Sequence, residues 1–288
     1  MIVESAQSPP DATAGSGDMS RIVIAGKGGV GKTTLTALLA RFLARQGMTV
    51  LAVDADAQMN LGYALGLPPA EAAAIVPLSD NPDYVEEKTG ARPGAGWTLM
   101  LRLNPDAGDA VERFSVPGPD GVQLIVMGSL HQAAAGCLCP ENTLLGAVIA
   151  AIALRPGELI LMDTQAGVEH FGRALARGFG QAVVVTDPSF NGLSIAVRTA
   201  SLARQLGIPH VHLVVNRVRG RADLERLDRH LDRIGGEPFA SRHVLPHDDR
   251  VLESEPAIDA LLEASWSPFT TAVMGLGDAL TRIARRVP

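Results

Sequence analysis

Residues 26–34 read GKGGVGKTT, a stretch that contains four glycines and two lysines. It matches the pattern G-x-x-x-x-G-K-[ST] and stands between two segments of different periodicity. The preceding run RIVIA (21–25) is short and β-branched, whereas TTLTALLARFLARQG (33–47) has the apolar spacing of an amphipathic helix. A glycine loop between a strand and a helix directs backbone N–H groups and the positive helix end at an anion. The stretch therefore predicts a phosphate-binding loop; the alternative is a glycine-rich turn that binds nothing.

Strand-like and helix-like segments alternate along most of the 288 residues. Buried strands that alternate with helices predict a parallel sheet covered on both faces. We therefore expect an α/β fold of the P-loop NTPase type, a single domain with a mainly parallel central sheet. The stretch 66–121 is rich in Pro, Gly and Asp, which predicts an irregular insertion of short helices and loops. Further strands are expected at 49–54, 122–128, 158–163, 181–187 and 210–216, and helices at 141–154, 168–178 and 191–206.

The two ends of the chain differ in character. Residues 1–19 are rich in Ser, Pro, Gly and Ala, which predicts a disordered leader ahead of a folded domain over 20–288. The tail (267–288) predicts an amphipathic helix, which fits a membrane-surface anchor or, as we favour, a helix packed on the sheet. No apolar run approaches the ~20 residues that span a bilayer, and no secretory signal is evident. The net charge of −6 argues against a nucleic-acid surface, so we expect a cytoplasmic protein that binds neither nucleic acid nor membrane.

The phosphate loop suggests a role for each of its residues. Lys32 is expected to bridge the β- and γ-phosphates of ATP, and the Thr33 hydroxyl to ligate Mg²⁺. Thr34 is expected to hydrogen-bond the α-phosphate. The backbone N–H groups expected to cradle the phosphates are those of Gly28, Gly29, Val30 and Gly31.

Acidic residues end two of the predicted strands. Asp163 closes ELILMD, where a carboxylate would hold a Mg²⁺-bound water. Asp54 and Asp56 follow the second strand at i and i+2, which places both on one side of an extended segment. We expect Asp56 to orient the attacking water. Asp54 either faces the phosphates as well or is a structural carboxylate that caps the loop.

Cys137 and Cys139 are the only cysteines, and they lie at i and i+2 in GCLCPENTLLGAVI (136–149). Their spacing allows a pair of thiolates, a strained local disulfide or two buried inert thiols. Two thiolates are half of a tetrahedral set, and a two-fold dimer would supply four sulfurs to one ion. Four sulfurs suit Zn²⁺ or Ni²⁺. The pair therefore indicates a candidate zinc or nickel site shared across a homodimer.

Lys27 directly follows the first loop glycine, and DADAQMNL (54–61) and DTQAG (163–167) follow later strands. Together these motifs resemble the deviant Walker A ATPases, which include MinD, ParA and nitrogenase iron protein. The resemblance implies a nucleotide-sandwich homodimer in which Lys27 crosses to the partner's nucleotide and acts in catalysis much as an arginine finger does. It also implies that Asn216 reads the adenine, flanked by LPHDD (245–249). The chain departs from the pattern at Ala57, where relatives have proline, and at Gln165, where close relatives often have glutamate.

The cysteine block and AGVEHFGR (166–173) resemble a narrower group, the CooC-type accessory ATPases of nickel carbon monoxide dehydrogenase. This resemblance covers residues from Arg21 to about Glu253. It implies an ATPase that couples ATP-driven dimer changes to insertion of nickel into a client enzyme. One alternative is a MinD- or ParA-like positioning ATPase without a metal role. Another is an electron-transfer ATPase with an iron–sulfur cluster, which the adjacent cysteines disfavour because that family draws its two cysteines from separated positions.

Overall fold

The computed structural model describes residues 17–92, 102, 105–128, 140–152, 154–165, 176–235, 239–263 and 266–285. Its centre is an eight-stranded sheet in the order β3-β4-β2-β5-β1-β6-β7-β8. Every neighbouring pair is parallel except β3 with β4 at one end of the sheet. The strands are β1 (Asp18–Gly26), β2 (Thr49–Ala55), β3 (Val116–Pro117), β4 (Gln123–Val126), β5 (Glu158–Thr164), β6 (Phe179–Thr186), β7 (His210–Val218) and β8 (Ser241–Pro246).

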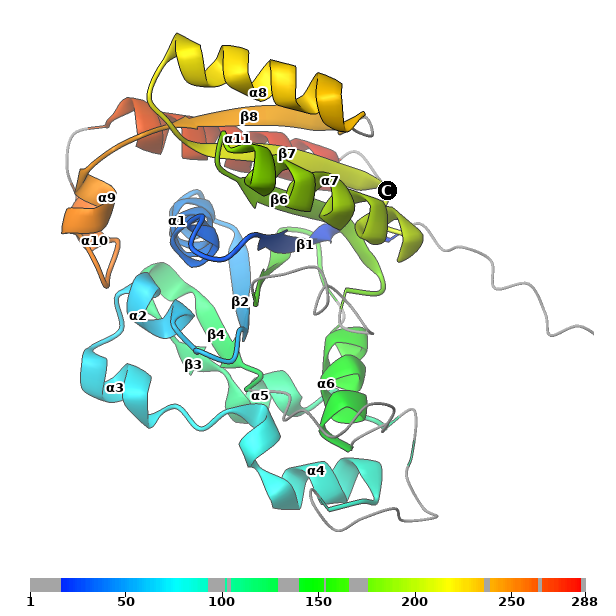
Figure 1. Ribbon diagram of the computed structural model, residues 1–288. Helices are drawn as coiled ribbons and strands as arrows, with labels where there is room; N and C mark the ends of the chain where they lie inside the picture. Colours follow the sequence, from blue (N-terminus) through cyan, green and yellow to red (C-terminus); the bar gives the residue numbers. More distant parts are fainter. Residues whose placement is uncertain are drawn as a thin grey trace, which may run out of the picture.

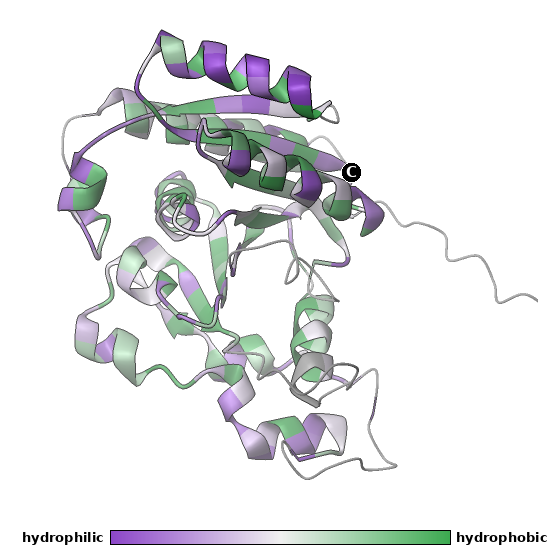
Figure 2. Cartoon of the chain, viewed as in Figure 1, coloured by the Kyte–Doolittle hydropathy of each residue, from purple (hydrophilic) through white to green (hydrophobic). Residues whose placement is uncertain are grey.

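Helices cover both faces of this sheet (Figure 1). Alternate residues of a strand point to opposite faces, so each central strand contributes to two cores. In β1, Ile22 and Ile24 pack against α1 (Lys32–Arg45) and α11 (Pro268–Ala284), while Val23 faces the helices of the other side. The strands are accordingly apolar along most of their length, whereas α8 (Arg221–Ile234) carries many hydrophilic residues (Figure 2). The helices α5 (Ala110–Phe114), α6 (Pro140–Ala151) and α7 (Phe190–Gln205) also lie on the second face, and α4 (Pro82–Thr89) packs against α6.

The expected fold class is confirmed: the chain forms a single α/β domain with a mainly parallel sheet. The sequence did not predict α8, β8 or the short edge strand β3. β8 has only one fully buried residue, Leu245, so it lacks the continuous apolar run by which buried strands were identified. The helix expected at 168–178 lies largely outside the described residues, and those at 141–154 and 191–206 correspond to α6 and α7.

The start of the domain lies slightly earlier than the expected boundary. β1 begins at Asp18, which pairs with Phe179 of β6 across a register shift, so residues 18 and 19 belong to the sheet and not to a leader. The sequence DMS is not strand-like by composition, and the pairing with β6 accounts for the extension. Residues 1–16 lie outside the described residues.

The irregular stretch 66–121 contains short helices, as expected. Tyr84 of α4 is buried and donates its hydroxyl to Asp109 at 2.9 Å, which ties α4 to the start of α5. The Arg113 guanidinium lies over the Tyr84 ring, 4.6 Å from its centroid. The helix α2 (Leu61–Leu65) precedes this stretch, which also contains α3 (Pro69–Ala74), η1 (Leu78–Asp80) and η2 (Pro119–Gly121).

The tail forms α11, which packs against α1 and the sheet instead of presenting an apolar face. Its buried residues include Phe269, Val273 and Leu280, and Gly277 lies against Leu43 of α1. This packing is the alternative that we favoured for the tail. Among the described residues, no helix is long and apolar enough to cross a membrane. Two short helices, α9 (Arg250–Glu253) and α10 (Asp259–Glu263), precede it.

Candidate nucleotide site

The phosphate loop leaves β1 at Gly26 and enters α1 at Lys32. Gly29 and Gly31 have φ values of 72° and 92°, a backbone conformation that side chains rarely adopt. Gly26 is constrained in a second way, because a Cβ there would lie 2.1 Å from the Val185 carbonyl oxygen of β6. The sequence emphasised Gly28, Gly29 and Gly31, whereas the geometry requires glycine at 26, 29 and 31. The place of Gly26 at the end of a buried strand is the sequence feature that could have indicated its close contact with a neighbouring strand.

The Lys32 side chain is buried, and its ammonium donates to the Lys27 carbonyl oxygen at 3.3 Å. Burial lowers the pKa of Lys32, and the nearby carboxylates of Asp163 and Asp56 act in the opposite direction. The amine therefore lies inside the curve of the loop, with two acidic side chains close enough to affect its charge. This is the position expected for a lysine that grips β- and γ-phosphates.

Thr33 and Asp163 meet at the start of α1. The Thr33 hydroxyl donates to Asp163 Oδ2 at 2.6 Å, and Asp163 is fully buried. Its other oxygen, Oδ1, is buried without a hydrogen-bond partner among the described residues. Burial raises the pKa of this carboxyl to about 7. A hydroxyl and a carboxylate with an unsatisfied oxygen are the hard ligands that Mg²⁺ prefers, so the two residues fit the expected magnesium site.

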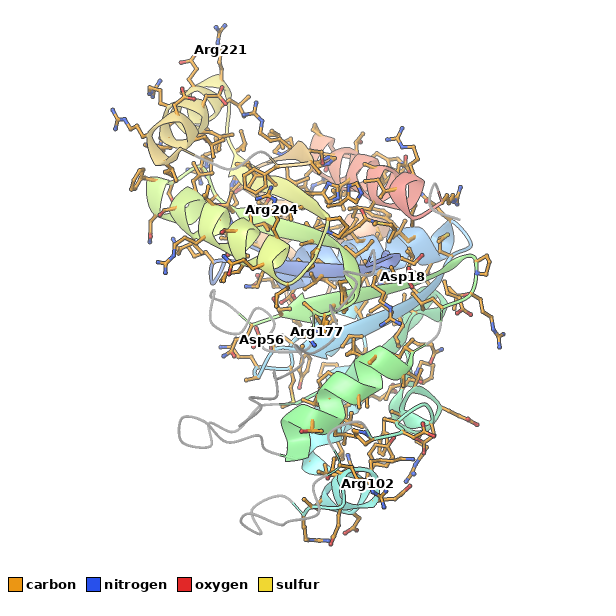
Figure 3. The ribbon with its side chains drawn as sticks, turned by 90° about the vertical axis from the view of Figure 1, so that its right-hand side faces the viewer. Asp18, Asp56, Arg102, Arg177, Arg204 and Arg221 are labelled. Carbon is orange, nitrogen blue, oxygen red and sulfur yellow. The ribbon has the colours of Figure 1, made fainter. Side chains whose placement is uncertain are left out.

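The two aspartates after β2 have different roles. Asp54 is fully buried, and its two oxygens accept the N–H groups of Asp56 at 3.0 Å and Leu61 at 2.9 Å. Burial raises the pKa of Asp54 to about 6. These bonds correspond to the loop-capping alternative, in which Asp54 shapes the turn between β2 and α2. Asp56 is only partly buried and lies at the carboxyl edge of the sheet (Figure 3).

Sheet register brings the acidic residues together. Asp54 of β2 and Asp163 of β5 are direct partners in the parallel ladder, and Ile24 of β1 pairs with Asp163 on the other side. Carboxyl ends of parallel strands meet at one edge, which is where open α/β sheets bind ligands. The Thr164 hydroxyl strengthens this edge by donating to the Ile24 carbonyl at 2.8 Å. The sequence carries no signal for this role of Thr164, although the residue follows Asp163 directly.

The remaining predicted residues lie around the loop. Lys27 is half-buried, and no carboxylate of the described residues forms an ion pair with its ammonium. Thr34 lies in the first turn of α1, the turn whose N–H groups are free for an anion. Asn216 of β7 reaches across and donates to the Val30 carbonyl. LPHDD closes β8 at the same edge of the sheet.

Cys137 and Cys139, and the whole of AGVEHFGR (166–173), lie outside the described residues. Their flanks are described. The Met127 N–H, one residue beyond β4, donates to the Asp54 carbonyl oxygen at 2.8 Å, and α6 begins at Pro140. Within the part of the chain that the structure describes, no group of three or more His, Cys, Asp and Glu side chains is arranged to hold a metal ion.

Comparison with known proteins agrees with this geometry. Residues 22–257 match the family described as the CobQ/CobB/MinD/ParA nucleotide binding domain. The carbon monoxide dehydrogenase accessory protein CooC of Rhodospirillum rubrum is 36% identical over 225 residues, which cover 77% of this chain and 84% of that protein. An uncharacterised ATP-binding protein of Methanocaldococcus jannaschii is 34% identical over 236 residues, covering 82% of this chain and 88% of that protein.

Solved structures show the same fold. The septum site-determining protein MinD of Pyrococcus horikoshii, complexed with Mg-ADP, aligns with a TM-score of 0.62 and 22% identity over 92% of this chain and 96% of that one. The phosphate loop, its buried lysine and the Thr33–Asp163 pair are consistent with membership of a nucleotide-binding family. The chain therefore belongs to the CobQ/CobB/MinD/ParA family of nucleotide-binding proteins, as a P-loop ATPase of the type represented by the carbon monoxide dehydrogenase accessory protein CooC.

Proposed function

We propose that this protein is an ATP-dependent maturation factor that works in the cytoplasm and delivers a metal ion, nickel or zinc, to a client metalloenzyme. Carbon monoxide dehydrogenase is the client that the comparisons favour. The observation that carries the proposal is the 36% identity to the carbon monoxide dehydrogenase accessory protein over 84% of that protein's length. Two further features support it: the nucleotide site and the cysteine pair.

The side chains around the loop are suited to ATP hydrolysis. The Lys32 ammonium lies within the loop, where it would leave the Lys27 carbonyl to bind β- and γ-phosphate oxygens. Thr33 Oγ1 and Asp163 would hold the magnesium ion, the second directly or through water. Bound Mg²⁺ would neutralise charge on the two terminal phosphates. Asp56, fixed at its N–H by Asp54, would orient the water that attacks the γ-phosphorus.

Lys27 has a separate role in this proposal. Its carbonyl faces the Lys32 ammonium of its own chain, and its side chain has no ion-pair partner among the described residues. A second copy of the chain placed face to face would receive this ammonium at its γ-phosphate. Charge that develops there during transfer would be stabilised as an arginine finger stabilises it. The homodimer would therefore be the active form.

The cargo metal would be bound by Cys137 and Cys139 of both copies, four thiolates in all. The segment that contains the cysteines follows β4 in the chain, and β4 ends beside Asp54 of β2. Met127 donates to the Asp54 backbone, and the Asp54 side chain accepts from Asp56 and Leu61. A change in the conformation of the loop around Asp56 on ATP binding would thus be transmitted to the cysteine segment through the pairing of β2 with β4. ATP and metal would be linked ligands, each altering the affinity of the other by the same factor.

The test compares wild-type protein with a Cys137→Ala/Cys139→Ala variant, in metal analysis and size measurement with and without ATP. We expect wild type to hold about one Zn²⁺ or Ni²⁺ per dimer, and the variant to bind ATP normally but to hold no ion. Addition of each protein with nickel to client apoenzyme should activate it only with the wild type. A Gln205→Ala variant, which changes an exposed side chain at the C-terminal end of α7, serves as a control that retains its metal.

The outcomes separate this function from the positioning alternative. ATP hydrolysis should also be measured with anionic vesicles. If the vesicles stimulate hydrolysis equally in wild type and in the cysteine variant, the maturation role is contradicted and a MinD- or ParA-like ATPase is favoured. Brown protein with thiolate-to-iron absorption after anaerobic purification would favour an iron–sulfur ATPase instead.

A further inference from the structure

The side chain of Asn216, at the carboxyl end of β7, uses both of its polar groups within the protein. Its amide Nδ2 donates to the Val30 carbonyl oxygen at 2.8 Å, and its Oδ1 accepts the Arg217 N–H at 2.8 Å. The residue is only 9% exposed. Its position is fixed further by Arg217, whose φ of 61° is unusual for a residue with a side chain. The amide is therefore held against the phosphate loop by contacts within the protein.

The bond to Val30 sets the direction of one peptide unit of the loop. In a planar trans peptide, the carbonyl oxygen and the following N–H point in opposite directions. When Asn216 holds the Val30 carbonyl outward, the Gly31 N–H must point inward, toward the space for phosphate. Gly31 is also the N-cap of α1, and no side chain caps this helix. Asn216 is thus the side chain that fixes the junction between loop and helix.

The fit between Asn216 and the loop is close. A Cβ at Gly31 would lie 2.8 Å from Asn216 Nδ2, nearer than packed atoms approach. Gly31 is therefore required by the amide as well as by its φ of 92°. Two segments 186 residues apart in the chain meet at this contact.

We propose that Asn216 is a positioning residue of the phosphate loop, which presents the Gly31 N–H to the phosphates of any bound nucleotide. This role is distinct from recognition of adenine. A residue that reads the base affects only ligands that have the base, whereas a residue that orients the loop affects every ligand with a polyphosphate. The two roles therefore differ in what they do to a ligand without a base.

The experiment measures binding of ATP and of inorganic tripolyphosphate, each with Mg²⁺, to wild-type protein and to Asn216→Ala by titration calorimetry. Loss of one net hydrogen bond corresponds to about a 5-fold weaker affinity, and we expect both ligands to lose affinity by at least that factor. Asn81→Ala is the matched control, since the Asn81 amide also donates to a carbonyl, that of Pro77 at 2.7 Å, but far along the chain from the loop. The control should leave both affinities unchanged.

Tripolyphosphate binding that is unchanged in Asn216→Ala while ATP binding weakens would overturn the proposal and leave Asn216 as a base reader. Unchanged binding of both ligands would overturn it as well. If the variant does not fold, the wild-type protein provides the answer through hydrogen exchange of the Asn216 side-chain amide, measured by NMR. Slow exchange of this amide with either ligand bound supports a lasting hydrogen bond from Asn216 to Val30. Exchange that becomes fast when ATP binds contradicts it.

Discussion

The carboxyl ends of the parallel strands form one edge of the central sheet and their amino ends form the opposite edge. The buried polar groups at these two edges differ in whether their hydrogen bonds are satisfied. At the carboxyl edge, Asp163 is fully buried with one oxygen that has no partner among the described residues. At the amino edge, His212 and Gln181 are equally buried, and every polar side-chain atom of both has a partner. Figure 3 places Asp56 and Asp18 at these opposite edges. The carboxyl edge therefore leaves a buried polar atom available for a ligand, whereas the buried polar atoms of the amino edge are paired within the protein.

The amino-edge network has a defined direction. Gln181 donates its amide to the carbonyls of Met19 at 2.6 Å and Leu280 at 3.1 Å, so its Oε1 must accept from His212 Nε2. The opposite nitrogen of His212 then accepts from the Ser241 hydroxyl at 2.7 Å. The network ties β1, β6, β7, β8 and α11 together and keeps His212 neutral.

The largest effect is expected at the carboxyl edge, from the two lysines. Lys27→Ala should lower turnover by about 10³-fold, as loss of an arginine finger does, and leave ATP affinity within a few-fold. Lys32→Ala should abolish tight ATP binding, because its ammonium is the one placed inside the loop. Turnover and nucleotide titration of both variants measure this difference. If the two variants lose the same property, the division of labour between the lysines is wrong.

Asp163→Asn should separate function from stability. The buried carboxylate is costly without a bound cation. Burial raises its pKa from 3.8 to about 7, so stability is lost as the pH rises between these values and the full cost is present at pH 8. The neutral variant should therefore unfold at no lower temperature than wild type at pH 8, while Mg²⁺-dependent nucleotide affinity falls by about 100-fold. Thermal melts and titrations with and without Mg²⁺ would show it. A variant that is less stable without ligand would mean that this edge is not left incomplete.

At the amino edge the expected effect is on stability alone, and it depends on pH. Burial lowers the pKa of His212 to about 4, with smaller contributions from the neighbouring His243 and His210. A depressed histidine pKa stabilises the fold above the unfolded value of 6.5, and the contribution is lost as pH falls toward 4. When the pH is lowered from 7.5 to 5, the histidine becomes protonated in the unfolded chain but stays neutral in the folded one. The free energy of unfolding should therefore fall by about 2 kcal/mol.

Urea unfolding of wild type and His212→Asn at the two pH values measures this contribution. The stability of the variant should depend less on pH, since asparagine does not titrate. Nucleotide affinity should remain that of wild type in both proteins at pH 7.5. An equal loss of stability in wild type and variant would show that the network is not the pH-sensitive element of this edge.

The smallest effect is expected from Arg21, which joins the amino edge to α6. Its side chain is 12% exposed and donates to the Ile149 carbonyl at 2.6 Å and to that of Ile152, at the C-terminal end of the helix. Arg21→Met should cost about 1.5 kcal/mol of unfolding free energy, the usual contribution of a charged hydrogen bond. ATP affinity should not change. A substantial loss of ATP affinity would contradict the independence of the two edges.

The sequence was informative where a residue type is demanded by local geometry and uninformative where the partner is distant in the chain. The order of strand, glycine loop and helix predicted the site, and the ends of β2 and β5 predicted its acidic residues. The hydrogen bond from Asn216 to the Val30 carbonyl could not be predicted, because it depends on how β7 lies relative to β1. The same holds for the network of His212, Gln181 and Ser241, which joins three strands through their register.

Secondary structure shows the same limit. The run ELILMD predicted β5 because it is apolar on both faces, whereas β8 and α8 have too few buried residues to give such a pattern. α8 buries only Leu227 fully, and its many arginines and aspartates obscure the helical spacing.

If two copies of the chain complete each other's ATP site, a mixture of Lys27→Ala and Lys32→Ala protein should hydrolyse ATP although neither variant does so alone. Each variant is expected to be inactive alone. In a mixed dimer, the Lys32→Ala copy supplies Lys27 to the intact loop of the other, so the mixture should recover about a quarter of the wild-type rate with random pairing. A mixture that hydrolyses ATP no faster than the sum of the two variants would contradict the account.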